Sequence, residues 1–189
     1  MLTDFQRAKI ARFFELLDRD ANGRMEIDDM IHVADELCAH RGWSPESREG
    51  RTLYGAYEDW WRDVREFANG DSVSLEGFLE YHERLLPNSD AFDESIGRLT
   101  GLLFSTLDAD DDARITVEEH RAFCHIFGFD PSLADMVFPR WDADGDGFVS
   151  LDELASVVRG FFYASEAEAP GNWLFGPMSS SVAELRSRG

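Results

Sequence analysis

A twelve-residue acidic segment occurs three times in this chain. The copies are DRDANGRMEIDD (residues 18–29), DADDDARITVEE (108–119) and DADGDGFVSLDE (142–153). Each has aspartate at positions 1 and 3, aspartate or asparagine at position 5, an apolar residue at position 8 and an acid at position 12. Carboxylates this close repel one another unless a cation lies between them. The repeat therefore predicts that each segment folds around a positive ion.

Apolar residues at helical spacing lie on both sides of each segment. Ile10, Phe14 and Leu17 precede the first copy, and the other copies have similar flanks. Asp130 followed by Pro131 is typical of a helix start ahead of the third copy. Each copy is therefore expected to be a helix–loop–helix unit. Proline at position 139 predicts that the helix entering the third loop ends early or kinks.

A fourth, degenerate unit fits the gap between the first and second copies. EFANGDSVSLEG (66–77) keeps a turn and an apolar Val73 at position 8, but Ala68, Gly70 and Gly77 replace oxygen-bearing residues. We therefore expect an all-α fold with four units in two pairs, 1–88 and 91–162, and short β-contacts between paired loops. Residues 163–189 form a tail that contains an aromatic segment and a short helix at about 182–186.

The repeat resembles the EF-hand calcium loop, D-x-[DN]-x-[DN]-G-x5-E. Calcium takes six to eight oxygen ligands, supplied by positions 1, 3, 5 and 12, by the carbonyl of position 7, and by position 9 directly or through water. The expected ligands are Asp18, Asp20, Asn22, Arg24, Glu26 and Asp29 in the first site; Asp108, Asp110, Asp112, Arg114, Thr116 and Glu119 in the second; and Asp142, Asp144, Asp146, Phe148, Ser150 and Glu153 in the third. Arg24, Arg114 and Phe148 contribute their backbone carbonyls.

Two departures from the pattern predict unequal sites. Ala113 stands at position 6, where glycine suits the sharp turn, so the second site is expected to bind more weakly. Asp29 is one methylene shorter than glutamate and is expected to give the ion one oxygen only. Fewer ligands favour magnesium, so Mg2+ is expected to compete with Ca2+ most strongly at residues 18–29.

Composition excludes several classes of partner. The formal net charge of -20 argues against nucleic acid and anionic membrane surfaces. The first residues carry charges throughout, and no stretch has the roughly 18 apolar residues of a membrane helix. Cys38 and Cys124 are expected to be reduced and buried. A cytoplasmic monomer without membrane insertion is the resulting expectation; the sequence indicates no particular protein partner.

Other chemistry-bearing residues have simpler interpretations. His120 and His125 lie five residues apart, off a shared helix face, so the histidines are expected to be exposed or hydrogen-bonded rather than zinc ligands. Trp60, Trp61, Trp141 and Trp173 are expected mainly in the core, with a cavity lining as the alternative. No phosphate loop or nucleophile motif is present, so no enzymatic activity is predicted.

Four units, an inactive second loop and the tail sequence PGNWLFG together resemble the sarcoplasmic calcium-binding protein family and its bacterial member calerythrin. The resemblance implies one compact globule, with Trp173, Leu174 and Phe175 packed into its core. It also implies a role in calcium buffering or transport. A calcium sensor that exposes a partner surface, and a ligand-binding relative with an internal cavity, remain the alternatives.

Overall fold

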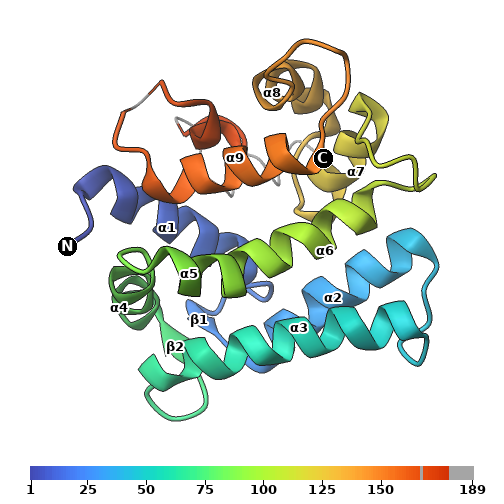
Figure 1. Ribbon diagram of the computed structural model, residues 1–189. Coiled ribbons are helices and arrows are strands. Elements are labelled where there is room, and N and C mark those ends of the chain that lie inside the picture. The colour runs from blue at the N-terminus through green and yellow to red at the C-terminus, as the bar shows by residue number, and fades with distance from the viewer. Residues whose placement is uncertain (167, 179–189) are drawn as a thin grey trace. The chain divides into compact units, whose positions relative to one another are not determined.

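The computed structural model describes residues 1–166 and 168–178. Helices dominate the chain (Figure 1), so the all-α prediction is confirmed. The chain divides into two compact units, Met1–Leu99 and a second that begins at Thr100. The expected helix at 182–186 lies outside the described residues.

The first unit contains two helix–loop–helix motifs. Its elements are α1 (Asp4–Leu17), β1 (Arg24–Met25), α2 (Ile27–Arg41), α3 (Arg48–Val64), the 3-10 turn η1 (Arg65–Phe67), β2 (Val73–Ser74), α4 (Leu75–Leu85), α5 (Ser89–Phe92) and the π-helical turn η2 (Asp93–Gly97). Strands β1 and β2 pair antiparallel, with Met25 opposite Val73. These are the apolar position 8 residues of the two loops, so the predicted β-contact is confirmed.

Side-chain caps and an aromatic cluster hold these helices in place. The hydroxyl of Thr3 accepts the N–H of Gln6 at the start of α1, which satisfies one of the free helix donors. Phe78 of α4 lies 5.6 Å from Phe14 of α1 and 6.2 Å from Trp60 of α3, measured between ring centroids. The two motifs therefore share one apolar core.

The second unit repeats the arrangement. Its elements are α6 (Arg98–Leu107), which spans the boundary between the units, α7 (Val117–Ile126), η3 (Pro131–Leu133), α8 (Ala134–Trp141), α9 (Leu151–Tyr163) and η4 (Pro170–Trp173). Ile115 and Val149, again at position 8, form an antiparallel bridge with two N–H···O bonds of 2.8 Å. Asp130 caps η3 as expected. Pro139 does not end α8, which continues to Trp141, so the prediction of an early end was wrong.

The tail segment η4 packs against α9 through two glycines. A Cβ at Gly171 would lie 2.4 Å from backbone atoms of Gly160 and Phe161, so only glycine allows this approach. Beyond the contact, Leu174 and Phe175 are buried, and Phe175 stacks 6.1 Å from Phe123 of α7. The tail therefore fills apolar space inside the second unit.

Gly171→Ala is expected to destabilise the second unit by about 1–3 kcal/mol, because backbone atoms rather than a flexible side chain must move. Thermal unfolding, with the Trp173 region followed by fluorescence, measures the effect. Gly101→Ala on α6 is the matched control, because its Cβ would meet nothing within 4 Å. Equal unfolding midpoints for the two variants would show that the glycine contact does not matter.

The cysteines and three of the four tryptophans named above lie where the sequence predicts. Cys38 and Cys124 are buried and free. Trp60, Trp61 and Trp141 are buried in the core, whereas Trp173 is half-buried beneath the guanidinium of Arg140, 3.9 Å from its ring centroid. Within residues 1–166 and 168–178, no helix has the length and apolar character needed to cross a membrane.

Candidate metal centres

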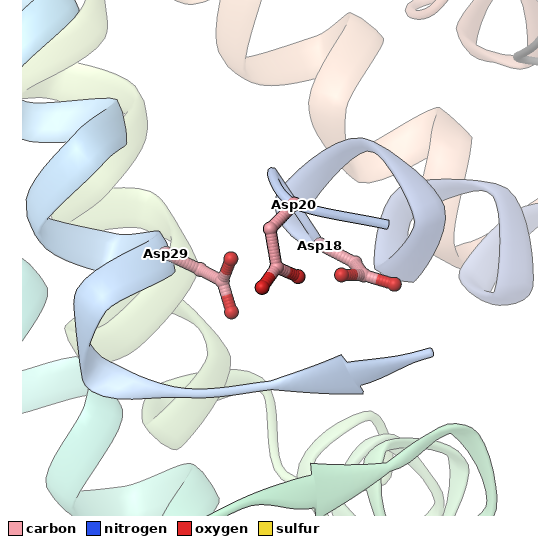
Figure 2. Close-up of side chains that lie close together, drawn as sticks. All are labelled: Asp18, Asp20 and Asp29. Carbon is pink, nitrogen blue, oxygen red and sulfur yellow. The ribbon is translucent and has the colours of Figure 1, made fainter. Parts of the chain in front are cut away.

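Each of the three acidic loops brings carboxylates together. Asp18, Asp20 and Asp29 each offer an oxygen within 4.8 Å of the others, and Figure 2 shows the three side chains converging. The same holds for the triad Asp108, Asp110 and Glu119 and for the triad Asp142, Asp144 and Glu153. Three separate loops thus repeat one local geometry at positions 1, 3 and 12.

The carboxylate at position 12 closes each loop in the same way. Glu153 accepts the N–H of Ala143 at position 2 (2.9 Å) and of Ser150 at position 9 (2.8 Å). Glu119 makes the corresponding bonds to Ala109 and Thr116, both 2.8 Å. Asp29, although shorter, does the same with Arg19 (2.9 Å) and Glu26 (2.8 Å). The first loop therefore keeps the hydrogen-bond pattern of the other two in spite of its shorter acid.

The aspartate at position 1 accepts backbone N–H groups from the middle of its loop. Asp18 accepts those of Asn22 (3.1 Å) and Gly23 (2.8 Å), and Asp108 accepts those of Asp112 and Ala113, both 3.0 Å. Burial nevertheless raises the pKa of Asp18 and of Asp108, and neighbouring carboxylates raise both further. A cation between the carboxylates would remove this electrostatic cost.

The pKa of Glu153 is shifted in the opposite direction, downwards. Burial acts to raise its pKa, but the N–H and hydroxyl of Ser150 and the N–H groups of Ala143 and Asp144 together lower it. The Ser150 hydroxyl donates to Glu153 (2.8 Å) and also accepts the Glu153 N–H (3.3 Å), which caps α9. Thr116 and Glu119 form the same capping box at α7. The position 9 hydroxyls therefore orient the closing acid.

The remaining predicted ligands lie in the loops with other contacts. At position 5, Asn22, Asp112 and Asp146 each use one side-chain oxygen to accept the N–H of position 7. At position 7, Arg24 donates to the carbonyl of Ser72 (3.3 Å), and Arg114 lies over the ring of Phe148. The assignment of these position 5 and position 7 groups as metal ligands, together with that of Glu26, stays a prediction.

Two positions in every loop adopt left-handed backbone. Position 6 does so at Gly23 (φ 80°), Ala113 (φ 65°) and Gly147 (φ 88°), which is the turn the sequence predicts. Position 4 does so as well, at Ala21 (φ 56°), Asp111 (φ 59°) and Gly145 (φ 75°). Of the three acidic loops, the loop 108–119 is the one with non-glycine residues at both positions. It therefore carries backbone strain of about 1–2 kcal/mol per residue.

Ala113→Gly is therefore expected to stabilise the calcium-loaded second loop by about 1 kcal/mol, or about fivefold in affinity. A calcium titration of the variant measures the change. Ala113→Val is the opposing control, because a β-branched side chain tolerates positive φ less well than alanine. If both variants bind as the parent does, strain at residue 113 does not limit this site.

The degenerate loop, residues 66–77, has lost its metal site through packing as well as through its sequence. Helix α3 continues as η1 through Phe67, so Glu66 at position 1 lies on a 3-10 turn. A Cβ at Gly77, position 12, would lie 2.6 Å from the carbonyl oxygen of Phe67. The space of the closing carboxylate is thus filled by backbone, and restoring glutamate at residue 77 cannot rebuild the site.

The expectation that the histidines are exposed or hydrogen-bonded was wrong for His120. His32, His40 and His125 are exposed, and His82 Nδ1 lies 2.8 Å from the Phe78 carbonyl. His120 is fully buried, and among the residues that the structure describes neither ring nitrogen has a hydrogen-bond partner. Its ring lies edge-on to Trp141 at 4.3 Å. Burial lowers the pKa of His120 to about 4, so it stays neutral at physiological pH.

The donor chemistry of the three clusters decides which ions they fit. Every donor is a carboxylate oxygen, with amide, hydroxyl and carbonyl oxygens nearby in the same loops. Hard divalent cations such as Ca2+ and Mg2+ prefer such ligands, whereas zinc sites use cysteine and histidine. The loops therefore fit calcium or magnesium.

Comparison with known proteins agrees with this chemistry. A sequence profile described as "EF hand" matches residues 133–158. Calerythrin from Saccharopolyspora erythraea is 25% identical over 168 residues, covering 86% of this chain and 95% of calerythrin. Obelin from Obelia longissima is 26% identical over 181 residues, covering 89% of this chain and 91% of obelin.

Solved structures share the fold. A Streptomyces coelicolor calcium-binding protein, described as a basis for prokaryotic calcium-mediated regulation, is 27% identical with a TM-score of 0.70, covering 86% of this chain and 100% of that one. An amphioxus sarcoplasmic calcium-binding protein is 21% identical with a TM-score of 0.73, covering 93% and 98%. The chain therefore has the EF-hand fold, and its loops are similar to those of EF-hand calcium-binding proteins. Within that class it is similar to calerythrin in sequence and to sarcoplasmic calcium-binding protein in fold.

Proposed function

We propose that this protein is a calcium buffer with three binding loops, 18–29, 108–119 and 142–153. The observation that carries the proposal is the filled groove of the second unit. Phe175 lies 5.1 Å from Phe161, 5.8 Å from Phe127 and 6.3 Å from Phe129 between ring centroids, so the tail covers the apolar surface that a sensor offers to a target helix.

The exposed surface supports the same function. Among the described residues, the large apolar side chains that are exposed are Met1, Leu75, Met136 and Leu151, and they come from different elements. A target-binding sensor exposes a contiguous, methionine-rich groove in its calcium form. The proposal includes a monomer in the cytoplasm that catalyses no reaction and binds no membrane.

A hydrophobic dye titration of the calcium-loaded and magnesium-loaded forms tests this function. A buffer should bind the dye equally weakly in both forms, because the tail stays in place. A large increase with calcium would contradict the buffer and favour a sensor. The Streptomyces relative, described in terms of calcium-mediated regulation, is the observation that keeps the sensor as the second candidate.

Similar solved structures raise a third candidate, a ligand-binding protein: one is a coelenterazine-binding protein from Renilla muelleri, and another is the photoprotein clytin. The cavity beside His120 in the second unit is only about 10 Å³, and the tail residues Leu174 and Gly176 close it. A cavity of that size holds about one water molecule. A thermal shift with aromatic ligands would be needed to support this candidate.

Magnesium competition is proposed to be strongest at the first loop. Asp29→Glu is expected to raise the preference of this loop for calcium over magnesium by about tenfold, because a second carboxylate oxygen suits the larger coordination sphere. Competition titrations with the two ions measure the change. Glu119→Asp is the reciprocal control and should lower calcium preference at the second loop. An unchanged preference in both variants would refute the role of side-chain length.

A further inference from the structure

The first unit contains a groove that the calcium loops do not use. Its volume is about 540 Å³, which lies in the range of ligand-binding pockets. The end of α3 with η1, helix α4, and the segment from α5 to α6 form its walls. Glu66, the first residue of the degenerate loop, lies on its lining.

The floor of the groove is aromatic and held in place. Phe67 and Tyr81 meet edge to face with ring centroids 5.8 Å apart, and Leu85 lies beside them. The Tyr81 hydroxyl accepts the indole N–H of Trp60 (3.1 Å) and lies 3.1 Å from the hydroxyl of Ser95. Because α3, α4 and η2 all contribute to this network, the floor is preorganised for an apolar stem.

One wall has unusual backbone. Residues Asp93–Gly97 form the π-helical turn η2, which places Glu94 and Ser95 on the groove. π-helical turns are rare and occur frequently at functional sites. The turn replaces ordinary helix just where the wall meets the Tyr81 hydroxyl.

The charges of the lining are unbalanced. Asp63, Glu66 and Glu94 are exposed, and in the described part of the chain none of them has an arginine, lysine or histidine within ion-pairing distance. Of the two lining arginines, Arg98 pairs with Asp59 (2.9 Å), whereas Arg84 lies on the groove itself, 4.8 Å over the Phe67 ring. Burial raises the pKa of Asp63 and the neighbouring charge of Glu66 raises it further, while Arg62 acts to lower it.

A bare metal ion does not fit this lining. Among the described residues, the acidic groups close enough to share an ion are those of the three calcium loops, and Asp63, Glu66 and Glu94 are not among them. An anionic ligand would meet three carboxylates, offset only by Arg84 among the lining residues that are outside an ion pair. An extended cation with an apolar stem matches both the negative charge of the rim and the apolar surface of the floor.

We propose that this groove docks a lysine or arginine side chain presented by a basic segment of a protein partner. The aliphatic stem lies on Tyr81 and Leu85, beside the Phe67 ring that Arg84 covers, and the cationic head lies among the rim carboxylates. The exposed rim lets the side chain enter while the partner's backbone stays outside. The degenerate hand, which has lost its ion, thereby contributes Glu66 to a protein-binding surface.

Fluorescence anisotropy with a labelled hexapeptide of alternating arginine and glycine tests the proposal on the full calcium-loaded chain. The groove variant combines Asp63→Asn, Glu66→Gln and Glu94→Gln. The matched control combines Asp71→Asn, Glu49→Gln and Glu58→Gln, which are exposed acids of the same unit outside the groove lining. The groove variant is expected to weaken peptide binding at least about tenfold, because it removes the charges next to the docked cation. The control is expected to weaken binding less than about twofold, because its charges lie outside the groove and salt screens their interaction with the peptide.

Three results would overturn the proposal. The first is failure of the parent chain to bind the peptide. The second is equal weakening by the two triple variants, which would show general attraction to an acidic chain. The third is displacement of the peptide by free spermidine as effectively as by unlabelled peptide, which would assign the groove to a small polycation. Calcium stoichiometry of both variants should match the parent, which separates failure of this proposal from failure of the calcium sites.

Discussion

Replacing Glu153 by glutamine is expected to abolish most calcium binding by the loop 142–153. Loss of groups that merely support a metal ligand costs about 10–100-fold in affinity, so loss of the closing ligand itself should exceed about 100-fold. Glu153 also accepts N–H groups from both ends of its loop, at Ala143 and Ser150. A glutamine amide keeps one acceptor and turns an N–H donor toward the other group.

Chelator-competition titration measures this loss, and the chain offers a close control. Asp152 immediately precedes Glu153 in the first turn of α9, is exposed, and lies outside the acidic cluster. Asp152→Asn removes the same charge and should change the affinity by less than about threefold, since surface charges act weakly. Similar losses in the two variants would mean that net charge, rather than ligand geometry, governs binding.

The second large effect concerns pH and the buried His82. Burial lowers the pKa of His82 from 6.5 to about 4, although a hydrogen bond with the Phe78 carbonyl acts the other way. Above pH 6.5 the folded and unfolded chains both hold it neutral. As the pH falls from 6.5 towards 4, the unfolded chain takes up a proton that the folded chain does not, so the free energy of unfolding falls by on the order of 3 kcal/mol.

Denaturant unfolding at several pH values between 4 and 7 measures this slope. His82→Phe removes the titrating group but keeps a ring beside Phe78 and Tyr81, whose centroids lie 4.4 and 5.0 Å from that of His82. The variant should lose less stability on acidification than the parent, whereas His32→Gln, at an exposed site, should follow the parent. Parallel curves for the parent and His82→Phe would contradict the account. Loss of calcium at low pH affects all three chains alike and cancels in the comparison.

Local sequence pattern predicted the features that depend on short segments. Aspartates at positions 1 and 3 and an acid at position 12 converge because the loop is a single turn of backbone between two helices. The apolar residues at position 8 paired as expected, Met25 with Val73 and Ile115 with Val149. The strain at Ala113 also followed from its place in the pattern.

Features that depend on packing between distant segments could not be predicted. In the degenerate loop, residues 66–77, the space for a closing acid is lost because Phe67 approaches Gly77. The tail packs on α9 because Gly171 approaches Gly160. His120 occupies the position after the closing acid, where the other three units have Met30, Phe78 and Leu154. Aligning the four units with one another therefore indicates that His120 is buried, whereas helical periodicity alone does not.

The most direct test of the central claim is a calorimetric titration of calcium into the metal-free chain, with about millimolar magnesium present. The account predicts three calcium ions per chain, one for each acidic cluster. For a buffer, the dissociation constants should lie near 10⁻⁹–10⁻⁸ M. Fewer than three ions, or constants near 10⁻⁷–10⁻⁵ M, would contradict a three-site buffer and direct attention to a sensor.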